Sequence, residues 1–341
     1  MRAILPEDPD PREQLASMNV RARRFQVPDE FDPLTASEKE LEEYGFPPRP
    51  DQATQPELYA FWLELFSRPL TYVEADFSLA LPDEYYSQSA GAPAARSRHE
   101  ASLNWSGAYV TPRDGRMFTQ VLGSWHVPTV VPPPGGSPAA TYGSSTWIGL
   151  DGQRSYLHST LPQIGTGQFL NLIGIPGSKT EAWIQWWPRC PVTLGMRVVP
   201  GDRMMAWLIV LNSTDVFFML ANYSRGLYSA FVLTAPMVTL PPHVSAPVQA
   251  NVSGATAEWV MERPAPCPHP DLFDLPDYSP VVFNNCYAVS APAPGGAIRV
   301  ETLAGARLIR MYAVKENPHR TVTVSVAEQL GPHQVKTSYL S

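Results

Sequence analysis

The sequence predicts an all-β fold, a sandwich of two antiparallel sheets, preceded by a short helical segment. Short apolar runs separated by Pro, Gly and Asn recur from Leu103 onward, and the chain contains 37 prolines. Aromatic residues make up 11% of the 341 positions, which is typical of short strands rather than long helices. A chain of this length buries a substantial core, and its length alone allows two domains.

Two helices are predicted near the amino terminus. Ser37 and Glu40 have the spacing of a capping box. Apolar residues recur at helical spacing over residues 56–68. We interpret residues 1–98 as a helical segment and a flexible linker, and residues 99–341 as the β-sandwich domain. The helices either pack on the sandwich as ordinary helices or form a pro-segment that covers a neighbouring site until it is removed.

At least ten strands are predicted after the linker. They are residues 117–127, 146–150, 181–187, 203–212, 217–222, 230–234, 257–261, 298–302, 307–314 and 321–326. Because side chains alternate along a strand, Trp183, Gln185 and Trp187 point to one face. Ile184 and Trp186 point to the other.

The same alternation places Glu258, Val260 and Glu262 on one face of their strand, and Trp147 on the same side as Asp151. Tryptophans thus stand beside amides or acids on several strands. A single such tryptophan is as well explained by an ordinary core position. Repeated on three strands, the mixture favours a concave face that binds an extended peptide or sugar chain.

Charge and composition exclude several partners. The formal net charge is -7, the pI is near 5.5 and the basic residues are scattered, so we expect neither nucleic acid nor an anionic membrane as partner. No stretch approaches the ~20 apolar residues of a membrane span. The amino terminus has no apolar signal region, so the protein is either intracellular or extracellular after a leader has been removed. We expect a monomer.

The cysteines allow at most one intramolecular disulfide, because there are only three: Cys190, Cys267 and Cys286. A bridge between Cys267 and Cys286 and three unpaired thiols both remain open. None of the three has a Cys-x-x-Cys partner, and Cys267 with His269 is poor metal-ligand spacing. We expect no metal site and no cofactor.

Seven motifs, in chain order, resemble those of the glutamic peptidases, or eqolisins. They are residues 104–109 (NWSGAY), 123–128 (GSWHVP), 147–152 (WIGLDG), 163–165 (QIG), 182–188 (AWIQWWP), 200–202 (PGD) and 257–262 (AEWVME). The resemblance covers residues 101–314. It implies a concanavalin-like jelly-roll sandwich and an endopeptidase that acts on peptides or proteins at acid pH, without a metal or a covalent intermediate.

The resemblance also implies the site residues. Gln163 and Glu262 match the catalytic pair. The cleft around them would be lined by Trp105, Trp147, Asp151, Glu181, Trp183, Gln185 and Trp187. One departure is clear: the family usually has Glu where this chain has Gln185. A neighbouring carboxylate would raise the pKa of Glu262 by repulsion, and an amide does not.

The pair suits peptide hydrolysis. An ionised Glu262 can take a proton from water as general base and return it to the leaving amine. The amide N–H₂ of Gln163 can donate to the developing oxyanion. Taken alone, Gln163 is better interpreted as a loop residue bonded to nearby backbone, and Glu262 as a surface carboxylate paired with Arg263. The order of the motifs favours the catalytic interpretation.

Three other functions fit less well. A jelly-roll glycoside hydrolase needs two carboxylates within about 9.5 Å, whereas Glu258 and Glu262 lie ~13 Å apart along one strand. A serine peptidase lacks support, since no Gly-x-Ser-x-Gly motif occurs and His158 near Ser159 is typical of a loop. A non-catalytic module that binds peptide or carbohydrate is the alternative that keeps the aromatic face.

Overall fold

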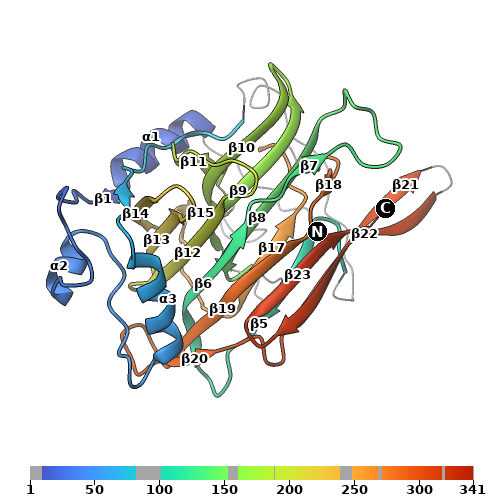
Figure 1. Ribbon diagram of the computed structural model, residues 1–341. Helices are drawn as coiled ribbons and strands as arrows, with labels where there is room; N and C mark the ends of the chain where they lie inside the picture. The colour runs from blue at the N-terminus through green and yellow to red at the C-terminus, as the bar shows by residue number, and fades with distance from the viewer. Residues whose placement is uncertain are drawn as a thin grey trace.

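The protein folds as two large antiparallel β-sheets packed on each other, as the computed structural model in Figure 1 shows. The structure describes residues 10–81, 101–152, 160–187, 189–238, 248–267, 271–316 and 319–340. The predicted all-β sandwich is confirmed. Strands missing from the prediction include residues 161–172 and 281–291, both of which are long and central.

The first sheet contains both residues of the predicted pair. Its strand order is β3 (Ser78–Leu79), β11 (Val192–Thr193), β10 (Ile175–Trp187), β9 (Leu161–Leu172), β8 (Tyr142–Leu150), β17 (Ala257–Glu262), β5 (Trp105–Val110) and β21 (Arg307–Glu316). Gln163 therefore lies inside strand β9, and its interpretation as a loop residue was wrong. β9 is hydrogen-bonded on both sides, which fixes the direction of that side chain.

The second sheet packs behind the first. Its strand order is β20 (Arg299–Glu301), β19 (Val281–Ala291), β6 (Met117–His126), β12 (Arg203–Val210), β13 (Asp215–Asn222) and β14 (Leu227–Thr234), with β1 (Arg23–Arg24) and β2 (Thr71–Tyr72) both paired to β14. Two minor pairs lie outside it: β7 (Val130–Val131) with β18 (Asp277–Tyr278), and β15 (Met237–Val238) with β16 (Val248–Gln249).

A third group of strands joins the two sheets along one edge. β22 (His319–Gly331) and β23 (Gln334–Tyr339) pair with each other, β22 also pairs with β21 of the first sheet, and β23 pairs with β19 of the second. The short β4 (Ala101–Ser102) runs parallel to β21. Figure 1 shows this group at the red, carboxy-terminal side of the molecule.

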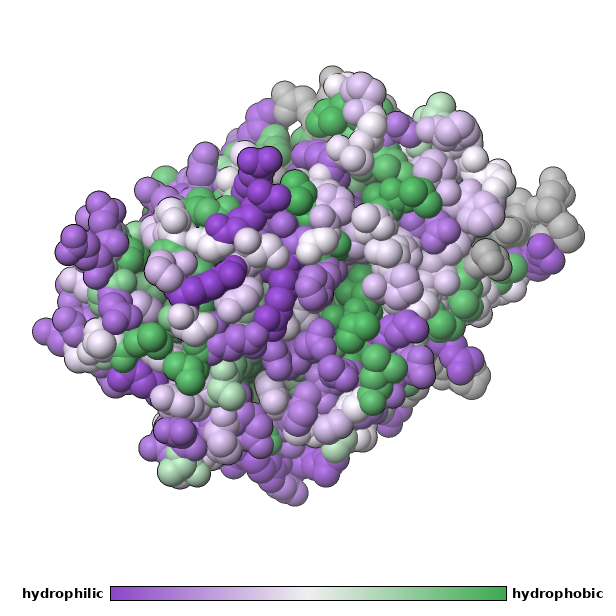
Figure 2. Space-filling view, viewed as in Figure 1, coloured by the Kyte–Doolittle hydropathy of each residue, from purple (hydrophilic) through white to green (hydrophobic). Residues whose placement is uncertain are grey.

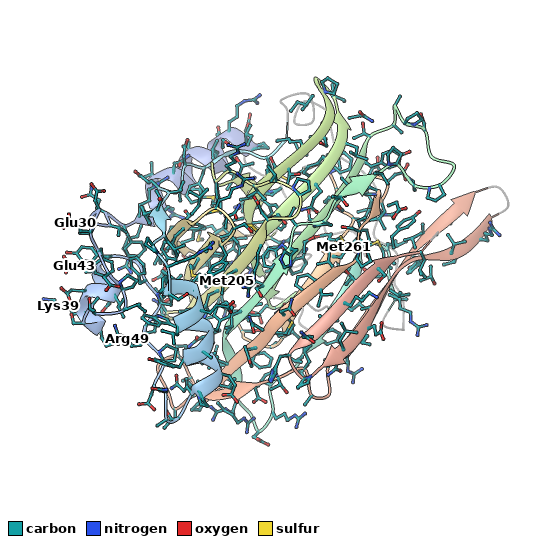
Figure 3. The ribbon with its side chains drawn as sticks, viewed as in Figure 1. Glu30, Lys39, Glu43, Arg49, Met205 and Met261 are labelled. Atoms are coloured by element: carbon teal, nitrogen blue, oxygen red, sulfur yellow. A yellow bond between two sulfur atoms is a disulfide. The ribbon has the colours of Figure 1, made fainter. Side chains whose placement is uncertain are left out.

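The main core lies between the sheets. Ile148, Ile164 and Ile184 of the first sheet are buried there, together with Trp259 and Met261 of β17. Figure 3 labels Met261, which lies in the interior of the molecule. The alternation predicted from sequence is confirmed, because these residues face the core and their strand neighbours face the other way. The opposite surface of the first sheet, which we call the outer face, carries a separate cluster around Trp147 and Trp183.

Within residues 10–81, three helices precede the sandwich: α1 (Pro11–Arg21), α2 (Glu38–Glu43) and α3 (Pro56–Phe66). The capping box that begins α2 is confirmed, since Ser37 N donates to Glu40 Oε2 at 2.8 Å and Glu40 N donates to Ser37 Oγ at 3.3 Å. α1 was not predicted; it has no buried residue, although Asp10 caps it and Pro11 begins it.

α3 covers the second sheet. Its predicted apolar stripe is buried against β12, β13 and β14 and consists of Leu58, Phe61, Trp62, Leu65 and Phe66. Figure 3 labels Met205, which belongs to the same cluster, and shows Glu30, Lys39 and Glu43 on the α2 side of the molecule. On the face seen in Figure 2, hydrophobic residues lie in small patches among hydrophilic ones.

The amino-terminal region is tied to the sandwich by strand pairing as well as by α3, since β1 and β2 extend the second sheet and β3 extends the first. The predicted boundary at residue 98 lies outside the described residues and stays a prediction. In the described part of the chain, no helix combines the length and the apolar character needed to cross a membrane.

One disulfide bridge is present, between Cys190 and Cys267, with 5.5 Å between their Cα atoms. The bridge between Cys267 and Cys286 that the sequence left open was wrong. Cys286 lies in β19 with its thiol in the core between the sheets, whereas Cys267 follows β17. The disulfide therefore links the loop after β17 to the turn after β10.

Candidate active site

The predicted site residues gather on the outer face of the first sheet. Strand register arranges the side chains there in three levels that run across β17, β8, β9 and β10. The first level is Glu258, Gly149, Gln163 and Gln185; the second is Val260, Trp147, Gly165 and Trp183; the third is Glu262, Ser145, Gly167 and Glu181. Eight of the nine predicted residues lie on this face of the strands, and Asp151 is the exception.

Gln163 is buried, with 2% of its surface exposed. Its Nε2 donates to Oε1 of Gln185, directly across on β10, at 2.7 Å. Nε2 of Gln185 donates in turn to the backbone carbonyl of Arg189 at 2.7 Å. The Oε1 atom of Gln163 is buried without a hydrogen-bond partner among the described residues. One end of this amide is therefore held and the other end is available to accept.

Glu262 ends β17 and lies opposite Trp105 on one side and Ser145 on the other. Its Oε2 accepts from the indole N–H of Trp147 at 2.8 Å, and its Oε1 accepts from Nδ2 of Asn104 at 3.0 Å. Burial raises the pKa of Glu262 to about 7, although these hydrogen bonds favour the carboxylate and oppose the shift. A carboxyl with a pKa near neutrality is suited to both accepting and donating a proton.

The two members of the predicted pair lie on the same face but on different levels. Gln163 pairs with Gly149 and Glu262 pairs with Ser145, so β8 runs between them with Trp147 at the level between theirs. The Trp147 indole ring is fully buried and reaches Glu262 directly. Trp147 thus forms the floor between the amide and the carboxyl.

A glycine makes room for the tryptophans. Gly165 lies opposite Trp147 on β8 and Trp183 on β10. A Cβ atom at this position would lie 2.2 Å from the carbonyl oxygen of Thr146 and 2.5 Å from Cβ of Trp147. Trp105 packs edge-on against Trp147, with 4.9 Å between ring centroids. The close approach of these strands therefore requires glycine.

The ends of β10 differ in character. Trp187 is 47% exposed and is open to contact a ligand. Glu181 is buried and its Oε2 forms an ion pair with Nζ of Lys179 at 2.5 Å. Burial raises the pKa of Glu181 to about 7, and the Lys179 charge opposes that shift.

Asp151 lies apart from the pair. It follows β8 with a positive φ of 71°, which interrupts the strand alternation used in its prediction. Its carboxylate accepts hydrogen bonds from Ser253 N at 2.5 Å, Ser253 Oγ at 2.9 Å and Ala255 N at 2.7 Å. The acid therefore holds the segment before β17, and a contact with substrate stays a prediction.

Glu258 is a further buried acid that was not predicted as a site residue. Its Oε1 accepts from the backbone N–H of Gly152 at 3.1 Å, and its Oε2 has no partner among the described residues. Burial raises the pKa of Glu258 to about 8, and the nearby Asp151 carboxylate adds to the shift. The raised pKa therefore favours the protonated form of Glu258 at neutral pH.

No group of three or more His, Cys, Asp or Glu side chains that could hold a metal ion occurs in the ranges that the structure describes. The acids of the outer face are instead separated by apolar or glycine positions, as Glu258 and Glu262 are by Val260.

Comparison with known proteins identifies the family. Residues 103–339 match the Peptidase A4 family. The chain belongs to the Peptidase A4 family. The motifs at residues 163–165 and 257–262, which contain Gln163 and Glu262, lie within this span. Membership of the family supports peptidase activity.

Solved structures share the Peptidase A4 fold. Crystal structures of scytalido-glutamic peptidase with a peptide-based transition state analog and with a transition state analog inhibitor are 18% and 19% identical to this chain, with TM-scores of 0.52 and 0.51. SCP-B, an eqolisin solved with the tripeptide Ala-Ile-His, is 18% identical, with a TM-score of 0.50. Each covers 70% of this chain and 98% of its own. No curated protein matched by sequence.

Sequence reasoning missed three features of this Peptidase A4 site. Asn104, which donates to Glu262, was noted only as part of a motif. Gly165 was noted in the same way. The carbonyl of Arg189 was not considered, and a backbone group leaves no signal in the sequence. The position of Asn104 next to Trp105 in the first motif was the available clue.

Proposed function

We propose that this chain is a glutamic endopeptidase that cleaves peptide bonds with Gln163 and Glu262. The observation that carries the proposal is the partly buried carboxyl of Glu262, held by two N–H donors on the same sheet face as the amide of Gln163. Trp105, Trp183 and Trp187 supply aromatic surface for the substrate beside this pair.

The proposed reaction needs no covalent intermediate. The carboxylate of Glu262 takes a proton from water, and the water oxygen bonds to the carbonyl carbon of the substrate. Nε2 of Gln163 donates its second hydrogen to the oxyanion that forms. Glu262 then returns the proton to the amide nitrogen, the C–N bond breaks, and a carboxylic acid and an amine leave.

The working pH follows from the protonation of Glu262. General-base action requires the carboxylate, which predominates only above the pKa of about 7 that burial gives this group. We therefore expect hydrolysis to increase toward neutral pH, whereas the family resemblance implies an acid range. Hydrolysis that is fastest near pH 3 would support the acid range and would mean that bound substrate lowers the pKa of Glu262.

The test uses the full chain with denatured casein from pH 3 to 8. We expect Glu262→Gln to lower kcat/KM by about 10²–10⁴, the usual contribution of a general base. Gln163→Ala should lower it by about 10²–10³, the usual contribution of an oxyanion donor. Glu328→Gln and Gln329→Ala, at two exposed positions of β22, are the controls. Undiminished hydrolysis by Glu262→Gln would reject the mechanism, and peptide binding without cleavage would favour the non-catalytic module.

A further inference from the structure

The amide of Gln185 connects the candidate site to the backbone. Arg189 offers a carbonyl oxygen, which only accepts, so the group of Gln185 that faces it must be the N–H₂. This leaves Oε1 of Gln185 facing Gln163, and an oxygen there requires the N–H₂ of Gln163 in return. The carbonyl of Arg189 thus sets which group donates and which accepts in both hydrogen bonds.

The carbonyl that sets this order is firmly held. Arg189 N donates to the carbonyl of Trp186 at 2.9 Å, which closes a turn directly after β10. The guanidinium of Arg189 donates to the carbonyl of Met237. The next residue, Cys190, is disulfide-bonded to Cys267, and its N–H donates to Oε1 of Gln14 at 3.1 Å. Backbone, side chain and disulfide therefore all restrain the same turn.

The order of the bonds has a consequence for Gln163. In a planar amide the oxygen and nitrogen point apart, so Oε1 of Gln163 is turned away from β10 when Nε2 is held by Gln185. Nε2 keeps one hydrogen for an oxyanion, and the unpartnered Oε1 can accept from a water. A flipped Gln163 would offer an oxygen where the reaction needs a donor.

A carboxylate at position 185 could not do the same. When ionised, this carboxylate has no hydrogen to donate to the carbonyl of Arg189. Its oxygen atoms and the carbonyl oxygen of Arg189 would repel each other. When protonated it has one hydrogen and can still accept from Gln163. The charged groups lining the ≈ 420 Å³ cavity beside Gln185 are Glu13 and Arg21 of α1 and Arg189 itself.

We propose that Gln185 is a positioning residue that fixes the orientation of the Gln163 amide and keeps it the same at every working pH. The proposal rests on the proposed function. Gln185 would thereby have a role at the position where this chain departs from the Glu that is usual in the glutamic peptidases it resembles.

The test compares kcat for Gln185→Glu and the near-isosteric Gln185→Met with that of the unchanged protein, on one peptide from pH 4 to 8. For Gln185→Glu we expect the kcat of the variant, divided by the kcat of the unchanged protein, to fall about tenfold as the introduced carboxyl ionises. KM should change much less. For Gln185→Met, which lacks both bonds, we expect kcat to fall about tenfold at all pH values. A purely structural role would not produce a pH-dependent ratio.

The matched control is Gln329→Glu. Gln329 is exposed and also donates to a backbone carbonyl, that of Gly331 at 3.1 Å, so the substitution makes the same chemical change away from the site. Its kcat ratio should stay constant with pH. In a folded, active protein, a kcat ratio for Gln185→Glu that stays constant with pH, together with an unchanged kcat for Gln185→Met, would reject the role of Gln185 without touching the proposed function. Absence of hydrolysis by the unchanged protein would instead reject the proposed function.

Discussion

Glu262 experiences two opposing influences. Burial favours its neutral acid, whereas the hydrogen bonds from Trp147 and Asn104 favour its carboxylate, and the balance leaves the pKa of Glu262 at about 7. Removing either donor, Trp147 or Asn104, should therefore shift the pKa of Glu262. The residue-level chemistry of the site depends on these partners as much as on the acid.

Replacing Trp147 with Phe should move this balance toward the acid. The variant loses the indole N–H that donates to Glu262 Oε2 at 2.8 Å but keeps an aromatic ring in the same space. We expect the pKa of Glu262 to rise by about one unit, since a hydrogen bond to a charged group contributes about 1.5–3 kcal/mol and part of it is recovered by water. The measurement is the pH dependence of kcat/KM, with Trp207→Phe in the second sheet as control. An unchanged midpoint would contradict this assignment.

At the residue scale, sequence patterns predicted which side chains share a face and not which of them bond. Strand alternation correctly grouped Trp183, Gln185 and Trp187. It failed at Asp151, because a positive φ after the strand turned that side chain toward residues 253–255. Alternation applies only while the backbone stays extended.

Strand β9 shows how an element can be hidden from sequence patterns. Its residues 161–167 include Pro162, Gly165 and Gly167, which are typical of turns and edges rather than of a central strand. The structure explains the glycines: a Cβ at Gly165 would meet Thr146 and Trp147 of β8, and a Cβ at Gly167 would meet Phe169 of β9 itself and Trp183 of β10. For Gly165 the compensating bulk lies on another strand, so no pattern within β9 could have shown it.

Gly165→Ala should therefore destabilise the first sheet. The added Cβ would meet the backbone carbonyl of Thr146 at 2.2 Å, a group that cannot rotate away. We expect a loss of roughly 1–3 kcal/mol in the free energy of unfolding, the usual cost of overpacking, together with reduced activity. Urea unfolding monitored by tryptophan fluorescence measures it. Gly331→Ala, where the nearest atom would lie 3.9 Å away, is the control and should change stability far less.

For the whole molecule, two buried acids, Glu181 and Glu258, and the partly buried Glu262 make stability depend on pH. Burial raises the pKa of Glu181 and Glu262 to about 7 and that of Glu258 to about 8. In the unfolded chain these groups ionise near their ordinary pKa of 4.5. Between pH 4.5 and 8 the folded state thus binds more protons than the unfolded chain does. The stability that these three carboxyls contribute is fully present below pH 4.5 and decreases as the pH rises through that range.

Glu258→Gln should reduce this dependence. The amide keeps the size of the protonated acid and cannot ionise, so a contribution on the order of 3–5 kcal/mol to the loss of stability between pH 4.5 and 8 should disappear. The free energy of unfolding in urea, measured at intervals across this range, gives the slope directly. A slope equal to that of the unchanged protein would contradict the prediction, and the exposed Glu328→Gln serves as reference.

The overall architecture was easier to predict from the sequence than the pairing of distant strands and cysteines. Regular alternation and frequent turns predicted the sandwich, and the stripe on α3 predicted a buried helix face. The pairing of β17 with β5 and β8, and the Cys190–Cys267 bridge, depend on contacts between distant segments. Such contacts follow from the packing of the whole chain and have no local pattern.

The position of β17 also has a consequence for how the protein is made. β17 is inserted between β5 and β8, which precede it by more than 100 positions, so pairing it requires closing long loops. We expect this step to come late in folding, after the local hairpin of β12 and β13 has formed. Until then, Glu262 is remote from Gln163 and Trp147. Under the proposed function, a nascent chain would thus lack the assembled Gln163 and Glu262 pair with which to cut itself or its neighbours during synthesis.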